Sequence, residues 1–180
     1  DDGGEIAEAV CGDLLAAHSA GCAIVHDMFA VRIEHKSSLC IASAGGSPKD
    51  INFIQSHKAI HHAHYAVADG GTLICLAECV DGIGNSGFLD WFRYGDEHSF
   101  REALLNRYSM NAHTALALRM KVQKMRIIFV SSLDPEIVRL MGMIPAATLS
   151  EAVELADGSG TALTDALVIP NASLIVPVID

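Results

Sequence analysis

The chain has 180 residues, a formal net charge of −10 and 51% hydrophobic residues. This length is sufficient for one domain with a sizeable core. The acidic balance argues against nucleic acid as a partner, because binding a phosphate backbone requires a basic surface. No apolar run reaches the ~18 residues that a membrane span needs, and no signal-peptide pattern opens the chain. We therefore expect a cytoplasmic protein with no membrane contact.

The cysteines support a reducing compartment. There are five of them, an odd number, and no two have the Cys-x-x-Cys spacing. Cys40 and Cys75 stand in apolar, strand-like runs, where cysteine acts as a small hydrophobic residue. Reduced thiols in the cytoplasm fit this usage best.

The first half of the chain predicts an acidic lead-in over residues 1–10 and a single domain over residues 11–180. Asp13 is expected to cap a helix over 14–29. A buried strand and a turn at Gly45-Gly46 follow. A long helix is then expected, with Ser47 as its N-cap, Pro48 as its first residue and Gly70-Gly71 as its C-cap.

The second half continues the alternation of strands and helices. We expect strands over 72–79 and 126–132, helices over 98–106, 111–123 and 135–141, a capping box over 148–151, and short strands over 166–169 and 174–178. This order predicts an α/β fold of three layers, a mainly parallel, Rossmann-like sheet with helices on both faces.

Such a sheet brings the loops at 44–48, 78–87 and 131–134 to its carboxyl edge, where ligands usually bind. Gly45 and Gly46 would allow close approach of another molecule to the backbone. Glu78 and Asp81 could serve as acid or base, or could cap the loop. The loop with Gly82 and Gly84 is either a flexible turn or a backbone cradle for an anion.

The helix after the glycine turn offers polar groups on one face. Gln55, Lys58 and His62 are spaced so that they share it. Lys58 could bind a carboxylate, and Gln55 could orient a hydroxyl or a carbonyl. The same spacing is typical of an ordinary solvated face. His57, His61, His62 and His64 are crowded on this helix, but no third ligand is evident, so we expect an exposed histidine-rich surface and no metal site.

Three groups of motifs resemble one family. They are Gly12-Asp13…Ala17-His18-x-Ala20-Gly21; Ala42-Ser43-x-Gly45-Gly46-x-Pro48-Lys49-Asp50-Ile51-Asn52-x-x-Gln55-x-x-Lys58-Ala59; and Gly70-Gly71-Thr72 with Ala77-Glu78-Cys79-x-x-Gly82-x-Gly84-Asn85…Phe88-x-x-Trp91. Together they resemble the C-terminal half of the lactate racemase-like proteins, which are nickel-dependent 2-hydroxyacid racemases and epimerases. Ile54 stands where the family often has an aromatic residue.

The resemblance implies a two-domain enzyme that uses a nickel-pincer nucleotide. Racemisation in this family proceeds by removal of hydride from the substrate Cα and its return on the other face. The cofactor attachment and the catalytic histidines belong to the N-terminal half, so no catalytic or metal-binding residue is expected in this chain. Gln55 and Lys58 match the substrate-binding Gln-x-x-Lys motif of the half that closes over the site.

The expected partners are therefore an N-terminal cofactor-binding domain of the same protein and a small 2-hydroxyacid. A homo-oligomer is possible. Two other hypotheses stay open from the sequence: a stand-alone module that binds a nucleotide or another anion without catalysis, and a purely structural or oligomerisation domain.

Overall fold

The computed structural model describes residues 5–160 and 164–179. Its helices and strands are, in order, α1 (Leu14–Phe29), β1 (Ala30–Ile33), β2 (Ser37–Ser43), α2 (Phe53–Ala63), η1 (His64–Ala66), β3 (Val67–Leu76), η2 (Leu89–Arg93), α3 (Glu97–Asn106), α4 (Ala112–Lys124), β4 (Arg126–Val130), α5 (Pro135–Leu140), β5 (Ile144–Ala146), α6 (Leu149–Asp157), β6 (Ala166–Ile169) and β7 (Val176–Ile179). The elements η1 and η2 are short 3₁₀ helices.

The centre of the fold is a five-stranded sheet in the order β5-β4-β3-β2-β6. All of its pairs are parallel, with Ile74 opposite Ile41 on one side and Ile128 on the other. Strand β3 is almost continuously apolar from Leu73 to Leu76 because helices cover both faces of the sheet. The predicted α/β fold with a mainly parallel sheet is confirmed.

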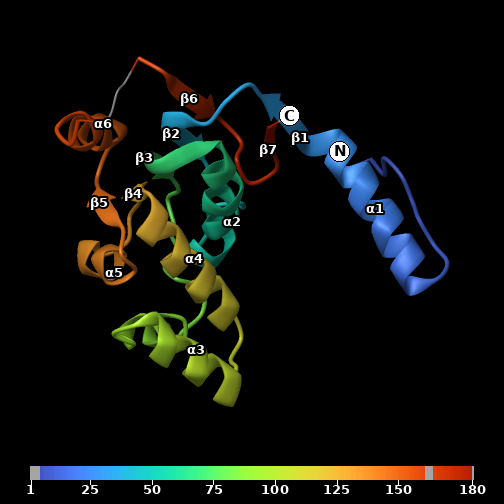
Figure 1. Ribbon diagram of the computed structural model, residues 1–180, viewed down its shortest axis with the longest axis horizontal. Helices are drawn as coiled ribbons and strands as arrows, with labels where there is room; N and C mark the ends of the chain where they lie inside the picture. Colours follow the sequence, from blue (N-terminus) through green and yellow to red (C-terminus); the bar gives the residue numbers. More distant parts are fainter. Residues whose placement is uncertain (1–4, 161–163, 180) are drawn as a thin grey trace.

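Helices lie on both sides of the sheet (Figure 1), and the cores on its two faces differ in size. On one face, α2 and α4 pack on the strands, and Phe53 meets Phe129 edge-on with ring centroids 5.5 Å apart. On the other face, α6 contributes Ala152 and Ala156, which pack near Ile74 and Ile128. The larger core contains α2, and this packing fixes the helix that carries the predicted polar face.

The start of α2 differs from the sequence expectation. Its N-cap is Asn52, whose side-chain oxygen accepts from the Gln55 N–H at 3.1 Å. Ser47 and Pro48 lie in the preceding turn, and Asp50 is in that turn as well, outside the first turn of the helix. The turn at 46–51 is closed by its own backbone hydrogen bonds, such as Lys49 N to Gly46 O, so these residues do not belong to the helix. The first position after the turn that can cap α2 is therefore Asn52 and not Ser47.

The end of α2 also differs. The helix stops at Ala63, and β3 begins at Val67, so Gly70-Gly71 lie inside a strand and are not a C-cap. The pairing of β2 with β3 shifts register at this point. Gly70 has φ of +78°, and a Cβ on Gly71 would lie 2.9 Å from the carbonyl oxygen of Ser38. The two glycines therefore permit an irregularity in the strand pair.

Two short strands, β1 and β5, were not expected from the sequence. β1 pairs in parallel with β7 in a separate two-stranded sheet. The predicted helix over 14–29 is confirmed, with Asp13 accepting from the N–H groups of Leu15 and Ala16. Asp134 likewise caps α5, with Pro135 as its first residue.

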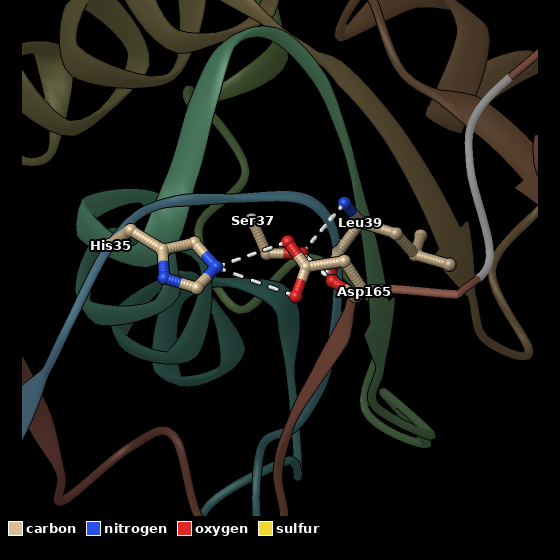
Figure 2. A network of polar contacts seen from close by, with 4 residues as sticks. All are labelled: His35, Ser37, Leu39 and Asp165. Atoms are coloured by element: carbon tan, nitrogen blue, oxygen red, sulfur yellow. Dashed lines mark hydrogen bonds and ion pairs between the residues drawn. The ribbon is translucent and has the colours of Figure 1, made fainter.

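A polar cluster holds the connection between β1 and β2 to the five-stranded sheet (Figure 2). The Nε2 of His35 lies 3.1 Å from a carboxylate oxygen of Asp165. The Ser37 hydroxyl accepts from the Leu39 N–H at 3.1 Å and contacts the carbonyl oxygen of Asp165. The chain is thus tied to the start of β6 as soon as it leaves β1. In the described residues, no helix is long and apolar enough to cross a bilayer.

Candidate functional site: a cleft at the carboxyl edge of the sheet

The carboxyl ends of β2, β3 and β4 open into a cleft of about 500 Å³. All three loops that the sequence placed at this edge contribute to it. The lining residues are Ser43, Gly46, Asp50, Leu76, Ala77, Glu78, Val130, Ser131, Ser132 and Ala147. The predicted convergence of loops is therefore confirmed, although the contribution of Ala147, which follows β5, was not foreseen.

Hydrogen bonds between the loops fix the floor of the cleft. The Asp50 carboxylate accepts from the Glu78 N–H at 3.2 Å. The Ser132 hydroxyl donates to the Glu78 carbonyl oxygen at 2.6 Å. Backbone N–H groups of Cys79 and Ser132 complete the junction by donating to the carbonyl oxygens of Asp50 and Glu78, respectively, each at 2.9 Å. The Glu78 backbone is thus rigid, while its side chain is exposed at the cleft.

Asp50 and Glu78 give the cleft a negative lining, with serine hydroxyls beside them. Two carboxylates that line the same cleft disfavour the binding of a free anion there. The cleft is consequently suited to neutral or hydroxyl-bearing groups, whose hydroxyls can donate to carboxylates. Asp81 does not line the cleft, and its N–H donates to the carbonyl oxygen of Ile51 at 2.8 Å.

The loop with Gly82 and Gly84 closes the N-terminus of α2. The Phe53 N–H donates to the Gly82 carbonyl oxygen at 2.9 Å, and the Ile54 N–H donates to the Ile83 carbonyl oxygen at 3.2 Å. The third N–H, that of Gln55, goes to the Asn52 cap. The groups that would bind an anion at a helix start are already satisfied. The glycine loop is therefore a cap on α2 and leaves that helix terminus without an anion site.

Gly45 and Gly46 have different surroundings. Gly45 has φ of +95°, and a Cβ there would overlap the side-chain oxygen of Asn171. The close approach that this glycine permits is thus by the C-terminal segment of the same chain. Gly46 has φ of +74°, lines the cleft and has open space where a Cβ would lie. Of the two, Gly46 is the position available to a ligand.

Gln55 and Lys58 lie together on α2, as predicted from their spacing. The Lys58 ammonium donates to the Gln55 side-chain oxygen at 2.7 Å. Lys58 is exposed, Gln55 is half-buried, and neither lines the cleft. Among residues 5–160 and 164–179, no carboxylate lies within ion-pair distance of Lys58. A cation without an internal counter-ion is therefore available to an external group on this face.

His62 has a structural partner that its spacing did not indicate. Its Nδ1 lies 2.8 Å from the carbonyl oxygen of Ala172, so this nitrogen carries the proton and donates. The same segment donates from Ala172 N to Ser43 O at 2.8 Å and from the Ser173 hydroxyl to Ala44 O at 2.7 Å. No local pattern in the sequence links positions more than a hundred residues apart.

The remaining histidines do not form the uniformly exposed surface that we expected. His57 is only 7% exposed, and its buried Nε2 has no hydrogen-bond partner among the residues that the structure describes. Burial, with a smaller contribution from Lys121 and from three nearby histidines, lowers the pKa of His57 to about 3 from its usual 6.5. His61 is exposed and stacks near His57. In the described part of the chain, no three His, Cys, Asp or Glu side chains are grouped so as to hold a metal ion.

The buried thiols are poor nucleophiles. Burial raises the pKa of Cys40 to about 12 and that of Cys79 to about 11. All five cysteines are free. Because the thiolate is the reactive form, these values argue against cysteine chemistry at the carboxyl edge.

A parallel α/β sheet with loops converging at its carboxyl edge defines a class of ligand-binding and enzyme domains. Within that class, residues 33–176 match the model of the lactate racemase C-terminal domain, and the chain belongs to this family. It is 31% identical to the lactate racemase of Thermoanaerobacterium thermosaccharolyticum over 163 residues, which is 87% of this chain and 38% of that protein. It is 30% identical to the lactate racemase of Lactiplantibacillus plantarum over 177 residues, which is 95% of this chain and 42% of that protein.

One solved structure agrees with this membership, and a second shares the fold. The apoprotein structure of the T. thermosaccharolyticum lactate racemase matches with a TM-score of 0.77 and 31% identity, over 90% of this chain and 40% of that one. A protein from Thermotoga maritima matches with a TM-score of 0.62 at 13% identity, which shows the likeness of fold alone. The chain spans about two fifths of the length of the curated relatives that it matches.

Proposed function

We propose that this chain is the substrate-closing C-terminal domain of a nickel-dependent 2-hydroxyacid racemase or epimerase. Its partner is an N-terminal domain of the same protein, which carries the cofactor and the catalytic residues. The family membership supports the racemase class. The observation that carries the role of this chain is the Lys58 ammonium held by Gln55 on α2, with no carboxylate of residues 5–160 or 164–179 within ion-pair distance of it.

The two side chains have complementary tasks. The Lys58 ammonium binds the carboxylate of the 2-hydroxyacid as a point charge. The Gln55 amide, whose oxygen already accepts from Lys58, presents its N–H groups to the substrate hydroxyl or carboxylate. Their helix is anchored by Phe53 in the core and by the capping loop at its start. A rigid support of this kind keeps the substrate oriented while its Cα changes configuration.

The described residues supply no cluster of metal ligands, so we assign nickel to the partner domain and route no step through this chain's histidines. The nickel-pincer nucleotide of the family would supply the hydride acceptor there. The cleft loops, including Gly46 and Glu78, would lie at the edge of the closed site, because these loops and the first residues of α2 are at the same carboxyl edge of the sheet.

The alternative of an independent anion-binding module is less well supported by the geometry. The first three N–H groups of α2 are taken by Gly82, Ile83 and Asn52, and the cleft is lined by two carboxylates. Both features disfavour a nucleotide phosphate at this edge.

The test is Lys58→Met in the complete racemase, with Lys124→Met, an exposed lysine at the end of α4, as the matched control. Removing a charged hydrogen bond to substrate costs about 1.5–3 kcal/mol, which predicts a loss of about 10- to 150-fold in kcat/KM. The control is expected to keep the parent value. Equal kcat/KM in both variants, with the thermal midpoint unchanged, would refute the assignment of Lys58.

A further inference from the structure

One side of the molecule exposes apolar groups that the site described above does not use. None of the residues of α1 is buried. Leu14 and Leu15 are 80% and 76% exposed, and Val25 and Met28 are also exposed. In Figure 1, α1 extends away from the rest of the molecule, beyond β1 and β7. A helix with apolar residues of this size normally covers a core, and here no core lies beneath it within the described residues.

Two of these side chains, Leu14 and Val25, border a groove of about 890 Å³. Val10, Leu14, Ala17 and Val25 line it together with Val176 at the start of β7. A groove whose lining is mainly apolar, on a helix with no buried residue, is the kind of surface that marks a contact with another molecule or domain. The groove is shared by α1, the segment before it and β7, so it is one continuous face.

The sheet beneath this face is also incomplete. β1 and β7 form a two-stranded parallel sheet, with Ala30 opposite Val176 and Ile33 opposite Ile179. Parallel strands are normally covered on both faces and belong to larger sheets, and an isolated pair is at best marginally stable. Val31 and Ile179 in this pair are exposed. A further strand and a covering layer would complete the structure.

The chain connects this two-stranded sheet to the five-stranded sheet twice, between β1 and β2 and between β6 and β7. The family domain begins at residue 33 and ends at residue 176, so α1 and nearly all of β1 and β7 lie outside it. On the inner side, His35 is tied to Asp165, and Ala172 is tied to Ser43. Both crossings are thus fixed to the family domain within a few residues, while the segments beyond them carry the unpartnered apolar face.

We propose that α1, the segment over residues 5–13 and the β1–β7 pair form the docking surface for the N-terminal domain of the same racemase. The occupant follows from chain length, because the curated relatives have about three fifths of their sequence outside the matched part, and this face is where the family domain begins and ends. The inference rests on the proposed function for the identity of the partner. The partner presents an apolar surface to α1 and a strand to the sheet of β1 and β7.

The experiment compares amide hydrogen exchange in two proteins, the 180-residue chain and the polypeptide translated from the complete reading frame. We expect the amides of α1 and β1 to exchange at least about tenfold more slowly in the complete polypeptide, because docking suppresses local opening. Amides of β3 serve as an internal reference for the folded five-stranded sheet. Val25→Asp in the complete polypeptide is expected to restore fast exchange in α1, whereas Ser19→Asp, an exposed position of α1 outside the groove, is not.

Three results would overturn the proposal. The first is a reading frame that encodes no additional domain. The second is equal exchange of α1 in the two unsubstituted proteins, a comparison that needs no variant to fold. The third is a dimer of the 180-residue chain that Val25→Asp dissociates, since the occupant would then be a second copy. Slow exchange of α1 in a complete polypeptide that racemises no 2-hydroxyacid would leave the docking surface standing and refute the proposed function instead.

Discussion

Acidification should destabilise this protein through His57. The residue is buried beside Phe53 and His61, and its Nε2 has no hydrogen-bond partner within residues 5–160 and 164–179. The pKa of His57 is lowered to about 3 in the folded state, first by burial and then by Lys121, His61, His113 and His64, whereas the usual value is 6.5. Between these two values the unfolded chain binds a proton that the folded chain does not, so stability falls as the pH falls through this window.

The size of the effect follows from the two pKa values. Lowering the pH from about 7 to about 5 protonates His57 in the unfolded state only, and the linkage relation gives a loss of about 2 kcal/mol from this residue. His57→Leu removes the titrating group and keeps an apolar side chain in the same space. The loss of stability between the two pH values is therefore expected to be about 2 kcal/mol smaller in the variant than in the parent chain.

Urea denaturation of the 180-residue chain and of His57→Leu at the two pH values measures this difference. Contributions from the other histidines, such as His64, whose pKa is lowered to about 4 mainly by burial, are present in both proteins and cancel. The reasoning fails if the two proteins lose the same stability on acidification. It also fails if the parent chain becomes more stable at the lower pH while the variant does not.

Two further substitutions test the packing around α2. Lys121 is buried on α4, donates to the Ala117 carbonyl oxygen at 3.2 Å, and has its pKa lowered to about 8 by burial. Lys121→Met should therefore raise the free energy of unfolding at neutral pH by about 1–2 kcal/mol. It should also abolish the rise in stability that the parent chain is expected to show between about pH 8 and 10.5, which urea denaturation across that range measures. Gly84→Ala would put an alanine in a left-handed conformation and place its Cβ 2.5 Å from Cγ of Asn52, so the free energy of unfolding should fall by about 2–3 kcal/mol. The matched control Gly82→Ala, with φ of +67° and open space around it, should lose only about 1 kcal/mol. Equal urea midpoints for the two variants would contradict the role of Asn52 as the cap.

The sequence was informative about α2 where local physics decides, and misleading where distant segments decide. The spacing of Gln55 and Lys58 was sufficient to place them on one face, because the helical period alone brings residues three apart together. The start of the helix was assigned to Ser47 and Pro48, which satisfy the same local preferences as Asn52. The choice between these caps depends on which backbone groups the loop at 82–83 satisfies, and that loop arrives from β3.

The histidines show the same limit. His57, His61, His62 and His64 look alike in the sequence, yet one is buried, one is exposed and one donates to Ala172. The partners that separate them are on α4 and in the segment before β7, and nothing local to α2 indicates either element. The roles of Gln55, Lys58, Glu78 and Asp81 in substrate binding remain predictions, because their test is enzymatic.

The amino-acid sequence by itself determined the alternation of strands and helices, the parallel sheet and the three loops at its carboxyl edge, because hydrophobic period and capping preferences act over a few neighbouring residues. Only the tertiary structure decided that the glycine loop closes the start of α2 and that the segment at Ala172 and Ser173 lies against Ser43 and Ala44. It also decided that α1 has exposed apolar side chains that no described part of the chain covers. Those features depend on contacts between segments far apart in the chain, whose free energy exists only once the sheet has assembled.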